Sequence, residues 1–137
     1  MSEMISWLRS TIEGDKAAAR TLPHGPWHRE GVYPQEISNA EAIVIAATYT
    51  NPSFPPDIAD HIIRHDPQDT IARCESELAL LDKVDEAGRG LKEALAEEDK
   101  MDVLLFTAAL GAFMLAAKAL AKGRRHRPGF NPEWVAE

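Results

Sequence analysis

The 137-residue sequence has little of what marks an enzyme or a secreted protein. Its one cysteine, Cys74, excludes an internal disulfide, so we expect a reducing, cytoplasmic setting. It contains no serine-nucleophile motif, no glycine-rich phosphate loop and no CxxC pair. The N-terminus is not basic and no uninterrupted apolar stretch with a cleavage site follows, so no signal peptide is expected. A non-enzymatic protein without a cofactor is favoured.

Positive charge is also scarce. The sequence contains 15 Lys and Arg residues and 22 Asp and Glu residues, which gives a formal net charge of −7. This balance argues against a protein that coats nucleic acid, because neutralising phosphates requires clustered cations. The exception is a basic run, Lys122 and Arg124–Arg127. The run could contact nucleic acid or an acidic partner, but cations after a helix end also complement the helix dipole. We favour the second interpretation.

A long hydrophobic run is almost absent. The most apolar stretch without a charge is Val103–Ala117, which as a helix would measure about 22 Å and fall short of the ~30 Å hydrocarbon core of a bilayer. The stretch is rich in alanine, and Lys118 ends it. We therefore expect a buried core helix rather than a membrane span.

What the sequence does have is helical periodicity, which predicts a mainly α (α+β) protein of one domain over residues 1–137. The predicted fold is a helical bundle with a small two-stranded β-hairpin and a docked C-terminal tail. We expect helices at 2–22, 56–65, 67–98 and 100–122, the hairpin within 27–50 and the tail at 123–137.

Three local signals set these boundaries. The segment Pro23–Pro26 ends the first helix, because proline lacks a donor and restricts the residue before it. Asp66 followed by Pro67 predicts an N-cap and a first helical position. Gly88 and Gly90 each disfavour a helix by about 1 kcal/mol relative to alanine, which predicts a kink or break.

Four segments carry a family resemblance. They are Trp7-Leu8-Arg9, Gly25-Pro26-Trp27, His61-Ile62-Ile63-Arg64-His65-Asp66-Pro67, and Pro128-Gly129-Phe130 with Trp134. Together they resemble a family of small uncharacterised proteins encoded by actinomycetes and their phages. The resemblance implies an accessory role in an actinobacterium or its phage, and it implies no activity.

One pair of residues suggests a metal site. His61 and His65 are four residues apart, a spacing that can present two imidazoles to one ion. A zinc site needs three or four ligands, and no catalytic glutamate lies between the two histidines. We therefore favour a structural interpretation and keep a metal sensor or metal-dependent hydrolase as the alternative.

Other residues are candidates for contact with a partner: Trp27, Arg64, His65, Phe130 and Trp134. Large aromatic and arginine side chains dominate protein interfaces. The favoured function is accordingly a protein-interaction or regulatory accessory protein, with a protein partner or a second copy of itself. A nucleic-acid or membrane-surface contact through Arg124–Arg127 is the third hypothesis.

Overall fold

A computed structural model describes residues 2–29, 36–39, 41, 43–47 and 55–136. It shows a mainly α protein with a small antiparallel sheet, which confirms the predicted fold class. The chain forms two compact units. The first, here called the helical unit, comprises Met1–Glu13 with Glu75–Glu137, and the second, the mixed unit, is Gly14–Cys74. The single domain over 1–137 stays a prediction.

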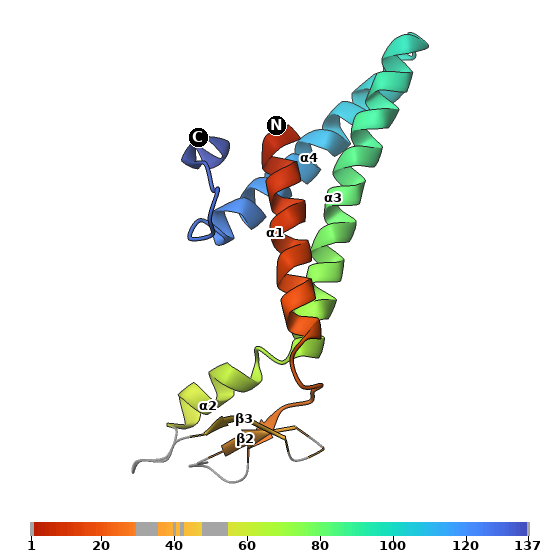
Figure 1. Ribbon diagram of the computed structural model, residues 1–137. Helices are drawn as coiled ribbons and strands as arrows, with labels where there is room; N and C mark the ends of the chain where they lie inside the picture. The colour runs from red at the N-terminus through yellow and green to blue at the C-terminus, as the bar shows by residue number, and fades with distance from the viewer. Residues whose placement is uncertain (1, 30–35, 40, 42, 48–54, 137) are drawn as a thin grey trace. The chain divides into compact units, whose positions relative to one another are not determined.

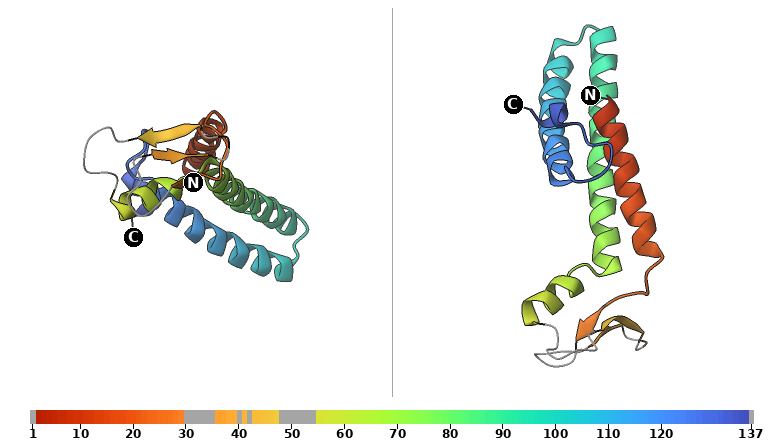
Figure 2. Two further views of the ribbon diagram at one scale, coloured as in Figure 1. Left: turned by 90° about the horizontal axis from the view of Figure 1, so that it is seen from below. Right: turned by 60° about the vertical axis from the view of Figure 1, so that its left-hand side comes forward.

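The helical unit contains the beginning of α1 (Ser2–Arg20), most of α3 (Pro67–Ala96), α4 (Lys100–Gly123) and the short 3-10 helix η1 (Pro132–Val135). Helices α3 and α4 form an antiparallel hairpin, and α1 lies along α3 (Figures 1 and 2). Asp99 caps α4, because its carboxylate accepts hydrogen bonds from the backbone N–H groups of Met101 and Asp102. The buried apolar core is Met4, Ile5, Leu8, Ile12, Leu81, Val84, Ala87, Ala94, Met114, Ala117 and Ala121.

Helix α4 is a core helix on one face only. The side of α4 on which large apolar residues recur every three or four positions, here called the apolar seam, faces inward: Ala117 is buried, and Val103, Phe106, Leu110, Phe113 and Leu120 are half-buried. On the opposite face Met101, Leu104, Leu105 and Leu115 are 60% to 73% exposed. By length and composition alone α4 could cross a membrane, and 11% of its most apolar window is buried. The expectation of a buried core helix is therefore wrong for most of α4, whose buried residues are Met114, Ala117 and Ala121.

Helix α3 is continuous from Pro67 to Ala96, so the kink or break predicted at Gly88 and Gly90 is wrong. Packing explains the glycine at one of these positions. A Cβ atom at Gly90 would lie 2.4 Å from Cε1 of Phe106, whereas a Cβ at Gly88 would meet nothing within 4 Å. Gly90 thus lets α4 approach α3 closely, and tertiary packing outweighs the low helix propensity of glycine.

Replacing the two glycines by alanine is expected to change stability in opposite directions. Gly88→Ala should stabilise the protein by about 0.5–1 kcal/mol, because the helix propensity improves and the new methyl group is unobstructed. Gly90→Ala should destabilise it by about 1–2 kcal/mol, because the clash with Phe106 exceeds the same propensity gain. Urea unfolding of both variants provides the comparison. Equal shifts of one sign would contradict the close packing at Gly90.

The mixed unit contains a three-stranded sheet of β1 (His28–Arg29), β2 (Glu36–Ser38) and β3 (Val44–Ala47). The order is β1-β2-β3 and both pairings are antiparallel, with a bulge between Ile37 and Ser38. The predicted two-stranded hairpin missed the middle strand. Strand β2 has three residues and one apolar side chain, too little for an alternating pattern. Residues 30–35, 40, 42 and 48–50 of the predicted hairpin lie outside the described residues.

One layer of side chains joins this sheet to α2 (Pro56–Ile63). Trp27, Ile37 and Ala59 are buried together, and the partly buried Ile45, Ala46, Ile62 and Ile63 pack against them. A salt bridge of 3.1 Å from Nη2 of Arg29 to Oδ1 of Asp60 also ties β1 to α2. A sheet this small is marginal in water by itself, so α2 supplies the apolar cover that it requires.

Candidate functional site

Asp66 joins two distant segments of the mixed unit. Its side chain is buried, and its Oδ1 and Oδ2 accept hydrogen bonds from the backbone N–H groups of Gln68 at 2.7 Å and Trp27 at 2.8 Å. The first bond is the predicted N-cap of α3. The second reaches across 39 residues of sequence. Each oxygen of this buried carboxylate thus accepts a hydrogen bond from a backbone N–H group, so the role of Asp66 is structural.

Gly25 completes this junction because it has no side chain. A Cβ atom at position 25 would lie 1.9 Å from Oδ2 of Asp66, so any side chain there would have to displace the buried carboxylate. The segments Gly25-Pro26-Trp27 and Asp66-Pro67 therefore interlock. Asn39 reinforces them, since its buried side-chain amide donates to the carbonyl oxygen of His24 at 3.0 Å.

An aromatic cluster joins α1 to the C-terminal tail in the helical unit. The ring of Trp7 lies 5.8 Å from that of Phe130 and 5.3 Å from that of Trp134, measured between centroids. The indole N–H of Trp7 also donates to the carbonyl oxygen of Pro128 at 2.8 Å. Gly129 has φ +80°, and a Cβ there would lie 3.1 Å from the indole nitrogen. The predicted docking of the tail therefore has a defined contact.

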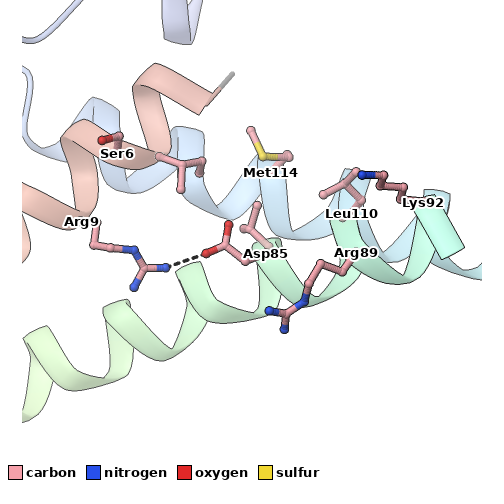
Figure 3. Close-up of a pocket in the computed structure, with 10 residues that line it drawn as sticks. Ser6, Arg9, Asp85, Arg89, Lys92, Leu110 and Met114 are labelled. Carbon is pink, nitrogen blue, oxygen red and sulfur yellow. Dashed lines mark hydrogen bonds and ion pairs between the residues drawn. The ribbon is translucent and has the colours of Figure 1, made fainter.

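A cleft opens among α1, α3 and α4 of the helical unit; we call it the three-helix cleft. Its volume is about 590 Å³. Figure 3 shows Arg9 of α1 and Asp85 of α3 pointing towards each other, with Leu110 and Met114 of α4 on the other wall. The lining residues are Ile5, Ser6, Arg9, Val84, Asp85, Gly88, Arg89, Lys92, Leu110 and Met114.

Arg9 fixes the mouth of this cleft with two ion pairs, each of 2.9 Å, to Asp82 and Asp85. Partial burial by itself lowers the pKa of Arg9, but the hydrogen bonds and negative charges of the two carboxylates raise it above its ordinary value. The guanidinium is therefore permanently charged and is already engaged. It orients α1 on α3 and is not a free binding group.

The model of the family described as "Family of unknown function (DUF6221)" matches residues 1–136. The chain belongs to this family. No curated protein and no solved structure matches the chain.

Within this DUF6221 protein, the residues chosen from the sequence as partner contacts separate into three groups by exposure. Trp27 is buried, and its indole N–H donates to the carbonyl oxygen of Pro23 at 3.1 Å, so it belongs to the core. Phe130 and Trp134 are half-buried against Trp7. Arg64 and His65 are exposed. Surface accessibility thus leaves Arg64 and His65 as the candidates whose side chains are open to a partner.

His61 and His65 do lie together, with ring centroids 4.6 Å apart, and Nδ1 of His65 is 3.0 Å from the carbonyl oxygen of His61. Among the described residues, no group of three or more His, Cys, Asp or Glu side chains is placed to hold a metal ion. The pair therefore lacks a third protein ligand within that part of the chain, which a structural or catalytic zinc site requires. Metal binding stays a prediction.

The basic run after α4 is partly occupied by intramolecular contacts. The guanidinium of Arg124 pairs with the carboxylate of Glu77 on α3, and both side chains are largely buried. Nη1 of Arg125 donates to the carbonyl oxygen of Lys122 at 3.4 Å, at the C-terminal end of α4. Nucleic-acid contact through Arg124–Arg127 stays a prediction, with Arg124 no longer available for it.

The three-helix cleft was missed by the sequence analysis. Its charged residues come from α1 and α3, and its apolar residues from all three helices. The one local signal is Gly88 between Asp85 and Arg89, where a helical surface loses a side chain. Periodicity cannot show that α1 and α4 enclose this position.

Proposed function

We propose that this protein is a non-enzymatic interaction module whose primary partner is a second copy of the same chain, joined through α4. One observation carries the proposal: the outer face of α4 exposes Met101, Leu104, Leu105 and Leu115 by 60% to 73% of their surface. Ala108, Gly111, Ala112 and Ala119 share this exposed side of the helix. Contiguous apolar surface of this kind is typical of interaction sites.

The pattern suits a helix–helix contact. Leu104, Ala108, Leu115 and Ala119 are spaced by four, seven and four residues, so they follow one another along one side of α4. Small residues between the leucines let a second helix approach closely. The tip of the α3–α4 hairpin, which carries Leu95 and Met101, also extends beyond the start of α1 (Figures 1 and 2).

The energetics permit association. Burying a leucine or methionine side chain completely stabilises by about 1.5–3 kcal/mol. Eight such side chains in a symmetric pair, each already partly covered, would contribute on the order of 8–16 kcal/mol. Association loses about 4–15 kcal/mol in translational, rotational and side-chain freedom. Micromolar affinity requires a net gain of about 8 kcal/mol, which lies within these two ranges.

A second copy fits this face better than a membrane. The opposite face of α4 holds Met114, Ala117 and Ala121 in the core of the helical unit. Insertion into lipid would therefore either separate α4 from that core or bring the ion pairs of α3, such as Arg9–Asp82, into hydrocarbon. A dimer leaves these contacts intact.

Sedimentation at several concentrations tests the proposal. The wild-type chain of 15.1 kDa should sediment with twice that mass at tens of micromolar, and Leu104→Glu combined with Leu115→Glu should weaken the dimer by at least about a hundredfold. Ile58→Glu is the matched control, because Ile58 is a 47% exposed apolar residue on α2. It should leave the mass unchanged. A monomeric wild type, with or without binding to lipid vesicles, would refute the proposal.

We also propose that the setting is the cytoplasm of an actinobacterium, or of the host of an actinophage. The support is the resemblance of the four segments at Trp7, Gly25, His61 and Pro128, together with the lone buried Cys74. The neighbouring genes test this assignment. A locus among secretion or central metabolic genes would count against an accessory role.

A further inference from the structure

The three-helix cleft has an apolar floor. Ile5, Val84 and Met114 are each at most 8% exposed, and the half-buried Leu110 continues this surface. A volume of about 590 Å³ lies within the range of sites that bind small organic molecules. The floor offers such a molecule an apolar contact area but no obvious hydrogen-bond partner.

The hollow exists because α3 carries a glycine where a side chain would fill it. Gly88 lines the cleft, and a Cβ atom built there would meet no atom within 4 Å. This differs from Gly90, whose missing side chain is explained by contact with Phe106. Packing within the helical unit therefore explains why residue 90 is glycine. It does not explain why residue 88 is glycine, a residue type that weakens a helix.

The rim of the cleft is cationic. Its charged lining residues are Arg9, Asp85, Arg89 and Lys92, a net charge of +2 in a chain whose formal net charge is −7. Asp85 is neutralised by Arg9. Arg89 lies near Glu86, whose pKa is lowered first by Lys83 and to a lesser degree by Arg89. Lys92 has no ion-pair partner among the described residues.

We propose that the three-helix cleft binds a small organic anion with an apolar body, of the class of medium-chain aliphatic carboxylates. The aliphatic part would cover Ile5, Val84 and Met114, and the space beside Gly88 would admit it. The carboxylate would be held by the ammonium of Lys92, which points towards Leu110 in Figure 3. The positive charge of the rim should make the cleft bind a carboxylate more tightly than a cationic amphiphile. The apolar floor should make it bind a ligand with an aliphatic tail more tightly than a simple inorganic anion.

This site is separate from the proposed dimer face. Leu110 and Met114 lie on the inner side of α4, whereas Leu104 and Leu115 are on its exposed side. A variant that is monomeric should therefore still bind the carboxylate. A variant that has lost the cleft should still form the dimer.

Calorimetric titration with decanoate below its micellar concentration tests the proposal. Decanoate should bind with one site per chain, and the affinity should fall as salt screens the rim charges. Decyltrimethylammonium, which has the same tail and the opposite charge, and acetate, which has no tail, should each bind at least about tenfold more weakly. Absence of decanoate binding, or equal binding of the cationic amphiphile, would overturn the proposal.

Three variants locate the site. Lys92→Gln should weaken decanoate binding about tenfold, and Lys118→Gln, which removes an equal charge from the exposed side of α4, should change it less than about twofold. Gly88→Leu should place a side chain in the cleft and abolish binding, and its urea unfolding curve checks that the variant is folded. Leu104→Glu with Leu115→Glu should retain binding. Full affinity in a folded Gly88→Leu variant would show that decanoate binds elsewhere.

Discussion

Asp66→Ala is expected to destabilise the protein by about 3–4 kcal/mol, far more than the loss of a helix cap. The substitution removes the acceptor for two backbone N–H groups, those of Trp27 and Gln68. A hydrogen bond to a charged group is worth about 1.5–3 kcal/mol, and a buried donor left without a partner loses a comparable amount. Unfolding in urea, followed by circular dichroism, measures the difference.

Asp99→Ala is the matched control for this experiment. Asp99 also caps a helix through two backbone N–H groups, at 2.9 and 3.1 Å, but it is exposed and holds no distant segment. Its loss should destabilise by about 1 kcal/mol, because water replaces the missing acceptor. Equal effects at Asp66 and Asp99 would mean that the bond to Trp27 contributes nothing. Gly25→Ala should be at least as damaging as Asp66→Ala, since its methyl group would overlap the same carboxylate.

The helical part of the fold could be predicted because its signals are local. Asp66 before Pro67 starts α3, and the apolar seam from Val103 to Leu120 faces inward as expected. The prediction was wrong where the local structure depends on residues that are distant in the sequence. Gly90 is helical because Phe106 of another helix fills the space above it, and no feature within α3 reveals that neighbour.

The middle strand of the sheet was missed for the same reason, because contacts with residues distant in the sequence stabilise it. Strand β2 exists because Ile37 is completely buried beside Trp27 and Ala59, although only one of its three residues is apolar. A strand this short gives no period to detect. The exposure of Leu104 and Leu115 was likewise unpredictable, because periodicity identifies the apolar residues of a helix but not which of its faces has a partner within the chain.

The residues that stood out in the sequence turn out to join parts of the fold. Gly25-Pro26-Trp27 meets Asp66 in the mixed unit, and Trp7 meets Pro128 and Phe130 in the helical unit. Glycine, proline and tryptophan attract notice because their conformations and sizes are unusual, and tight junctions need those properties. The three-helix cleft, in contrast, is made from ordinary residues on three helices. Only the assembled structure brings them together.

Trp7→Ala is expected to destabilise the helical unit by about 3 kcal/mol and to release the C-terminal tail. Truncation of a large aromatic residue in a core costs about 3–5 kcal/mol, and Trp7 is half-buried, which places it at the lower end. The tail loses both ring contacts, to Phe130 and Trp134, and the hydrogen bond to Pro128. Urea unfolding measures the first effect, and the rate of tryptic cleavage at Arg125 measures the second.

Trp7→Phe separates the two kinds of contact. A phenyl ring keeps most of the aromatic packing but has no N–H to donate to Pro128, so the variant should lose about 1 kcal/mol of stability and leave tryptic cleavage at Arg125 slow. Arg124, through its pair with Glu77, anchors the start of the tail in both variants. If Trp7→Ala cleaved no faster than Trp7→Phe, that anchor would be sufficient to hold the tail. The aromatic cluster would then stabilise α1 alone, and Phe130 and Trp134 would be left free to contact a partner.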